Sequence, residues 1–135
     1  MAANTTDLRT PAQPLERFAD DRQILLTTYR RDGTPVGTPV HVVVDGDHAY
    51  VRTFEPSGKL KRIRRNPDVE VAPSTLRGRP TGPATPATAR VLEGDEAEHA
   101  ARLLAAKYPV LHGRLIPWYH RRKRLVTTEL ELTAR

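Results

Sequence analysis

A cluster of cationic side chains stands where a β-strand is followed by a helix in the sequence. Five of the seven residues from Lys59 to Arg65 are lysine or arginine. The first turn of a helix leaves backbone N–H groups free and carries the positive end of the helix dipole, so cations added there make a site for phosphate. The alternative is a solvated cationic helix face, the usual meaning of a charge run. The whole stretch is Thr53-Phe54-Glu55-Pro56-Ser57-Gly58-Lys59-Leu60-Lys61-Arg62-Ile63-Arg64-Arg65-Asn66-Pro67.

The histidines raise the question of a metal site. No pair of them has the helical i, i+4 spacing of a zinc motif, and no aspartate or glutamate completes a recognisable ligand set. We therefore expect no metal. The five histidines are His41, His48, His99, His112 and His120.

Composition limits the classes of protein further. The chain has 135 residues, a formal net charge of +6 and no cysteine, so disulfides and thiolate metal sites are excluded. It lacks an apolar run of membrane-spanning length and a secretory pattern, so we expect a soluble, cytoplasmic protein. The positive charge favours an anionic partner. Trp118 and Tyr119 lie between basic residues, but no established nucleic-acid-binding motif is present, and we expect neither a nucleic-acid nor a membrane partner.

The pattern of apolar residues and turn formers predicts one domain, 14–135, after a polar tail, 1–13. Asp32-Gly33 is typical of a hairpin turn, and Pro39 marks a bulge or an unpaired edge position. The first three strands should form an antiparallel meander. The order of elements predicts a mainly β, α+β protein: an antiparallel split β-barrel of six or more strands with peripheral helices. We expect helices at 14–19, 57–66 and 95–108, strands at 24–29, 36–44, 49–53, 69–72, 87–92 and 125–132, a loop at 73–86, and a basic segment at 112–124.

Three segments, taken together, resemble a known family. The chain is similar to the split β-barrel flavin and deazaflavin oxidoreductases, the superfamily of pyridoxamine 5′-phosphate oxidase. Within it, the chain most resembles the small actinobacterial coenzyme F420-dependent oxidoreductases. The segments are Ile24-Leu25-Leu26-Thr27-Thr28 through Asp32-Gly33 to Thr38-Pro39-Val40, then Ser57-Gly58-Lys59 with Lys61 to Pro67, and Arg77-Gly78-Arg79-Pro80-Thr81-Gly82.

The resemblance implies a homodimer that binds its cofactor at the interface. It implies that Thr38, Pro39 and Val40 lie along the (deaza)isoalloxazine ring, and that Arg77 and Arg79 meet the partner subunit or an acidic cofactor tail. His41 then becomes a candidate for substrate contact, with a solvent-exposed strand histidine as the alternative. The residues placed at the cofactor phosphate are Arg52, Thr53, Ser57, Gly58, Lys59 and Arg62.

The function implied is hydride transfer between coenzyme F420 and an unidentified conjugated small molecule. The cations beyond Lys59–Arg65 favour F420 over FMN, because F420 adds an acidic tail to its phosphate. The alternatives are an FMN-dependent oxidase or reductase, and a flavin, deazaflavin or tetrapyrrole binding protein without turnover. A dimer is also expected because a short chain should leave part of its β-branched surface uncovered; the alternative is a monomer whose valines all face one interior. These residues are Val40, Val42, Val44, Val69 and Val71.

Overall fold

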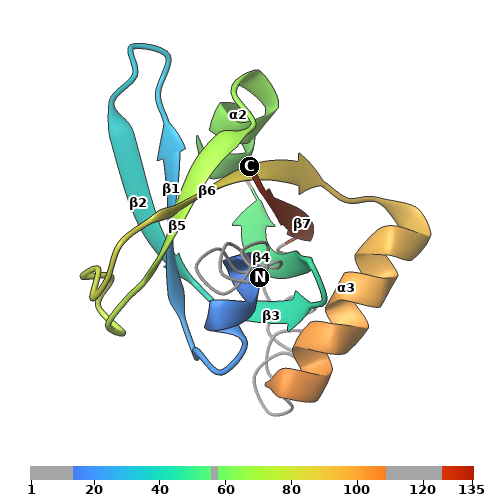
Figure 1. The fold of residues 1–135 in the computed structure, drawn as a ribbon. Helices are drawn as coiled ribbons and strands as arrows, with labels where there is room; N and C mark the ends of the chain where they lie inside the picture. Colours follow the sequence, from blue (N-terminus) through green and yellow to red (C-terminus); the bar gives the residue numbers. More distant parts are fainter. Residues whose placement is uncertain (1–13, 56–57, 109–125) are drawn as a thin grey trace, which may run out of the picture.

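A computed structural model of the chain describes residues 14–55, 58–108 and 126–135, and its strands curl into a half-barrel with helices outside (Figure 1). The elements are, in chain order, the 3₁₀-helix η1 (Pro14–Phe18), β1 (Ile24–Tyr29), β2 (Pro35–Val40), β3 (Val42–Asp45), β4 (His48–Glu55), α2 (Gly58–Arg65), β5 (Asp68–Pro73), β6 (Thr85–Val91), α3 (Gly94–Lys107) and β7 (Val126–Ala134).

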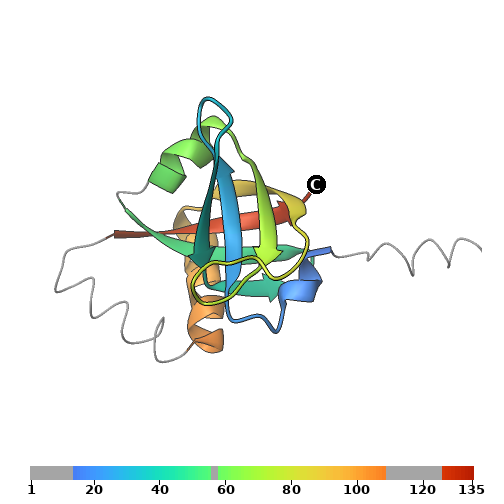
Figure 2. The ribbon, with the colours of Figure 1, turned by 90° about the vertical axis from the view of Figure 1, so that its left-hand side faces the viewer.

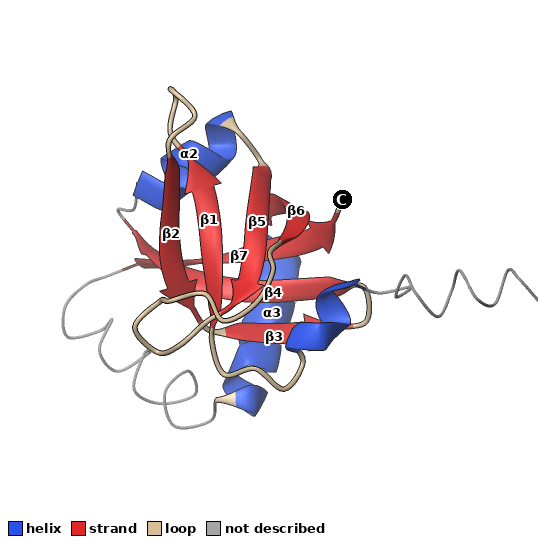
Figure 3. Cartoon of the chain, turned by 60° about the vertical axis from the view of Figure 1, so that its left-hand side comes forward, coloured by secondary structure: helices blue, strands red, loops and turns tan. Residues whose placement is uncertain are grey.

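Within the described residues, seven strands form one antiparallel sheet in the order β2-β1-β5-β6-β7-β4-β3. The sheet folds over on itself, so that β2, β1 and β5 cross steeply over β7, β4 and β3 (Figures 2 and 3). The two edge strands, β2 and β3, are consecutive in the chain. This arrangement encloses a core on the concave side of the sheet.

Side chains at every second strand position fill the barrel interior, as the alternation of a pleated strand requires. On β1, Ile24 and Leu26 are fully buried, and the same face continues with the buried hydroxyl of Thr28. Other members of the core include Ala49, Val51, Leu130 and Leu132.

Helices α2 (Gly58–Arg65) and α3 (Gly94–Lys107) cover different parts of the barrel. Helix α2 inserts Leu60 and Ile63 into the barrel core, each 2% exposed. Helix α3 lies along the outside (Figure 1), where Ala100 packs with Tyr50 and Leu92 in a second apolar cluster. Burial of these two apolar residues therefore holds the start of α2 at the barrel. Of its cations, Lys59 and Arg62 are half-buried, and the others are exposed.

The predicted strand 36–44 and the predicted three-strand meander are wrong. The segment forms β2 and β3, which lie at opposite edges of the sheet with His41 between them. The His41 ring stacks on Tyr108 at 4.5 Å between ring centroids. The carbonyl of Val42 accepts hydrogen bonds from the Tyr108 hydroxyl at 2.9 Å and from Lys107 at 2.8 Å. Contacts from the end of α3 thus fix the bend of the chain at His41. No local sequence pattern predicts these contacts.

The premise that this chain cannot bury its valines is also wrong. Val42, Val69 and Val71 are fully buried in the single chain, Val40 is 8% exposed, and Val44 packs against the same core. Closure of the half-barrel covers this surface, so these valines give no argument for a dimer.

The predicted fold class is confirmed, with seven strands in one curled antiparallel sheet and helices at its periphery. The remaining predicted strands and helices begin and end within two residues of the observed bounds. The predicted tail 1–13, Ser57 and the basic segment 112–124 lie outside the described residues. No helix in the described part of the chain has the length and hydrophobicity needed to cross a membrane.

Candidate functional site: the cationic start of helix α2

The first turn of α2 brings a glycine and an arginine into contact. Gly58 opens the helix, and Arg62 stands one turn later, where helical geometry places its side chain over the same face. A Cβ added to Gly58 would lie only 2.8 Å from Nη1 of Arg62. The absence of a side chain at Gly58 therefore makes room for the guanidinium at the start of the helix.

The Arg62 guanidinium is held in place by the barrel. Its Nε donates a hydrogen bond to the hydroxyl of Thr28 at 2.7 Å. Thr28 is fully buried at the end of β1, so the anchor is rigid. Thr28 was not among the residues predicted for this site. The pattern that indicates it is a polar residue that continues the buried face of Ile24 and Leu26.

The positive charges at the start of α2 repel one another, and burial disfavours them further. Burial first, and then the nearby Arg30 and Arg65 guanidiniums, lowers the pKa of Arg62. The pKa of Lys59, which is half-buried, is lowered by burial first and then by Arg62. An anion bound here would offset both the burial and the mutual repulsion of these cations. The arrangement fits a phosphate group in geometry and in charge.

Substituting Gly58 with alanine should separate binding from stability. The new methyl group must displace Nη1 of Arg62 and strain the bond from its Nε to Thr28, a cost that the higher helix propensity of alanine offsets in part. We expect the free energy of unfolding to change by less than about 1 kcal/mol, while the affinity for a phosphate-bearing cofactor falls several-fold. Denaturant unfolding and cofactor titration of the same variant measure the two effects. Unchanged cofactor affinity would contradict a role for the Gly58–Arg62 contact.

Two residues predicted to bind the phosphate have other environments: one forms an ion pair and the other is buried in the sheet. Arg52 faces the outside of the barrel, where its Nε bonds the Glu129 carboxylate at 2.9 Å, with both side chains under 10% exposed. Thr53 is 4% exposed and pairs across the sheet with Thr128. Glu129 satisfies the Arg52 charge, so Arg52 is not oriented toward the start of α2. Glu129 lies 77 residues from Arg52 in the chain, so the sequence did not predict this pairing.

The predicted ring strand lies next to the cationic site along β2. Val36 pairs with Thr28, and Thr38 is two residues further along, about 7 Å, on the same inner face. Thr38 is half-buried, whereas Val40 belongs to the core and can offer only its backbone to a ligand. The predicted edge position of Pro39 is confirmed, because β2 is an edge strand.

Arg77 and Arg79 belong to a separate group on the other face of β2. Their loop is braced by Gly78, at φ +88°, where an added Cβ would lie 3.3 Å from the Pro39 ring. Both arginines are exposed beside Leu76, at a pocket of about 480 Å³. The structure therefore brings these arginines to Pro39 but not to the Gly58–Arg62 contact.

His41 is a corner residue, so the alternative of a solvent-exposed strand histidine is wrong. It is half-buried against Tyr108, and burial first, then Arg22 and Lys107, lowers its pKa. Its predicted contact with substrate stays a prediction. Among the described residues, no three side chains of histidine, aspartate or glutamate are grouped so that they could hold a metal ion.

Comparisons with known proteins place the fold. No protein-family model matches the chain, and a search of curated proteins finds no match. Solved structures do match. A candidate pyridoxamine 5′-phosphate oxidase from Listeria innocua aligns with a TM-score of 0.61 at 16% identity, covering 90% of this chain and 90% of that one.

Two other similar structures differ in what their names say of them. An F420-H2 dependent reductase, FDR-A, aligns with a TM-score of 0.59 at 21% identity over 82% of this chain and 93% of its own. The heme storage protein HutZ from Vibrio cholerae aligns with a TM-score of 0.63 at 14% identity over 92% and 89%. The fold of this protein is therefore the split β-barrel of the pyridoxamine 5′-phosphate oxidase-like proteins.

Proposed function

We propose that the protein is a coenzyme F420-dependent oxidoreductase that transfers a hydride between the deazaflavin and a conjugated small molecule. The observation that carries the proposal is the cationic start of α2, where Gly58 makes room for Arg62 and Lys59 adds a second interacting charge. The likeness in fold to an F420-H2 dependent reductase supports it.

The residues present fit the phosphate end of such a cofactor. Lys59 and Arg62 would bind the phosphate, and Thr28 would keep the Arg62 guanidinium in position. Thr38 and the outer edge of β2, an edge strand with backbone groups left unpaired, would bond the ring. When bound, a reduced deazaflavin supplies a hydride, and a proton completes the reduction of the acceptor.

Titration of the purified protein with F420 and with FMN tests the proposal. We expect F420 to bind more tightly than FMN, because its acidic tail can reach cations that FMN leaves uncontacted. If FMN binds at micromolar concentration and F420 does not bind, the proposed cofactor would be a flavin rather than a deazaflavin. Binding of neither would reject the cofactor site.

A binding protein without turnover is a second candidate, favoured by the likeness in fold to a heme storage protein. The two candidates differ in one measurement. With reduced cofactor under anaerobic conditions, an oxidoreductase reduces a conjugated acceptor. A binding protein retains its ligand, heme or flavin, and reduces none.

We also propose a homodimer with the cofactor between the subunits. Leu76 supports it, because it is 70% exposed, the one large hydrophobic side chain so exposed in the described part of the chain. Arg77 and Arg79 line the same surface pocket as Leu76. Light scattering at micromolar concentration should report twice the chain mass of 15.1 kDa. Leu76→Glu should shift the protein toward the monomer, whereas Leu76→Met should not. A monomer that still binds cofactor would contradict the proposal that two subunits share the cofactor site.

A further inference from the structure

Arg30 lies beside the start of α2, although it comes from a different element. It follows β1 directly and stays paired with the segment that leads into β2, because its backbone N–H donates to the carbonyl of Thr34 at 2.9 Å. Side chains of a strand alternate between its two faces, so Arg30 falls on the inner face with Thr28. Thr28 is the residue whose hydroxyl accepts the hydrogen bond from Arg62. Arg30 is thus one alternation beyond the anchor of Arg62.

The hairpin that joins β1 and β2 fixes the backbone of Arg30. Gly33 adopts φ +90°, a conformation that favours glycine, and its N–H donates to the Arg30 carbonyl at 2.9 Å. Both backbone polar groups of Arg30 are therefore used within the hairpin. Helix α2 packs against β1 at this end (Figures 2 and 3). The exposed Arg30 side chain consequently starts from a defined position next to the helix.

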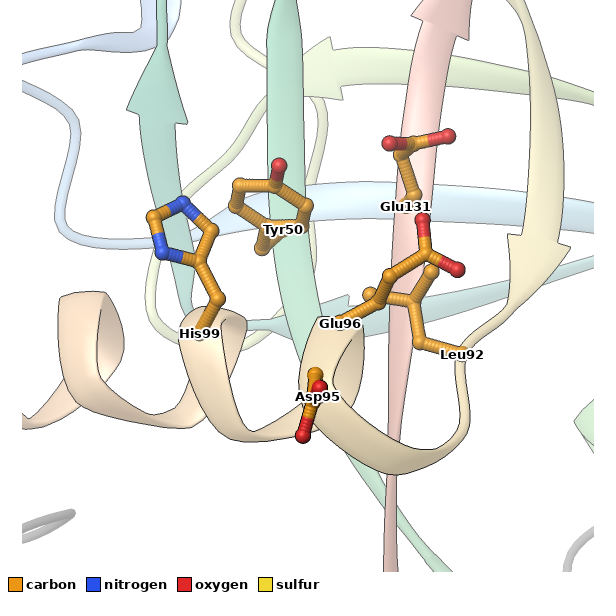
Figure 4. Close-up of a pocket in the computed structure, with 6 residues that line it drawn as sticks. All are labelled: Tyr50, Leu92, Asp95, Glu96, His99 and Glu131. Atoms are coloured by element: carbon orange, nitrogen blue, oxygen red, sulfur yellow. The ribbon is translucent and has the colours of Figure 1, made fainter.

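Several arginines elsewhere in the described part of the chain are neutralised by carboxylates. These arginines are Arg52, Arg90 and Arg135. At the pocket beside α3, where Figure 4 shows Glu96 and Glu131, Arg90 binds both carboxylates, at 2.7 and 3.1 Å. The carboxylates of that pocket already have a cationic partner.

The charges that act on Arg62 are instead positive. After burial, Arg30 is the next cause that lowers the pKa of Arg62, and Arg65 follows. Asp32 is the acid of the hairpin, and its carboxylate accepts from the Thr34 N–H at 3.0 Å, a bond that lowers its pKa more than Arg30 does. Cations from two elements therefore repel one another here, and a bound anion would relieve that repulsion.

We propose that Arg30 binds the same phosphate as Arg62, so that the phosphate lies between α2 and the hairpin. This assignment rests on the proposed cofactor site and adds to it a residue from a second element. Because Thr28 takes the Nε–H of Arg62, that guanidinium presents its Nη groups from the helix side. Arg30 donates from the hairpin side, and a guanidinium can give a phosphate two parallel hydrogen bonds.

The test is an NMR titration of the full chain, free of cofactor, with inorganic phosphate at constant ionic strength. The α2 amides and the Arg62 Nε–H report binding. We expect a millimolar dissociation constant for the parent protein. Arg30→Gln should weaken binding by about three- to tenfold, since a charge-assisted bond at an exposed site is partly screened.

Arg31→Gln is the matched control, because it removes the same charge from the next residue of the hairpin. It should change the affinity for phosphate less than twofold. Equal losses in Arg30→Gln and Arg31→Gln would mean that the hairpin attracts phosphate only by its overall charge, and would overturn the assignment of Arg30.

Arg62→Gln separates a failure of this assignment from a failure of the cofactor site. If Arg62→Gln, folded by NMR, loses phosphate binding while Arg30→Gln binds as tightly as the parent, Arg30 is not a ligand and the site at α2 stands. If the parent protein shows no saturable shifts with phosphate, both Arg30 and the phosphate site at α2 are wrong.

Discussion

Replacement of Glu129 with alanine is expected to lower the free energy of unfolding by about 3–5 kcal/mol. Glu129 and Arg52 face each other on β7 and β4, with 9% and 8% of their side chains exposed. Removing the carboxylate leaves a guanidinium buried without a counter-charge, and that desolvation is the source of the cost. Denaturant unfolding followed by circular dichroism measures it.

Two companion variants show whether the unpaired charge is responsible. Asp68→Ala breaks a well-exposed contact with Arg135, 3.9 Å long, and should change the stability far less. The double substitution Arg52→Met with Glu129→Leu removes both charges and should recover most of the loss. A double variant as unstable as Glu129→Ala would mean that packing, rather than the buried charge, carries the effect.

Replacement of Lys59 with alanine should weaken cofactor binding by about ten- to a hundredfold, the equivalent of about 1.5–3 kcal/mol for a charge-assisted bond to phosphate. In the structure, Lys59 is half-buried near Arg62. Burial and Arg62 both disfavour the charge, so the fold should not depend on the ammonium group.

Lys61→Ala is the control for this experiment. Lys61 is an exposed cation on the same helix, and its loss removes the same formal charge from α2. Affinity should fall only slightly, since a distant exposed charge acts through screened solvent. Equal losses in both variants would show that the helix attracts the cofactor only by its overall charge. No loss in Lys59→Ala would remove Lys59 from the site.

The local elements of this protein were determined by the sequence itself. The apolar and β-branched run from Ile24 to Tyr29 predicted β1, and Asp32-Gly33 predicted its hairpin, because both depend on neighbours in the chain. The nearness of Gly58, Lys59 and Arg62 follows from helical spacing alone. A cationic turn at the start of a helix could therefore be predicted without the fold.

The tertiary structure decided which of those residues face one another. Thr28 meets Arg62 across 34 residues, and Glu129 meets Arg52 across 77. The contact with Thr28 holds Arg62 at the predicted site. The contact with Glu129 directs Arg52 away from it. The local sequence identifies both arginines as charged but does not specify their partners, because register and closure of the sheet set those distances.

The corner at His41 shows the same division. The β-branched residues of segment 36–44 predict one continuous strand. In the described part of the chain, Tyr108 and Lys107, at the end of α3, contact the point at which it divides into two edge strands. That turn closes the half-barrel over its valines and places β2 beside the start of α2. Local propensity thus determined the elements, whereas long-range hydrogen bonds and burial decided the shape of the site.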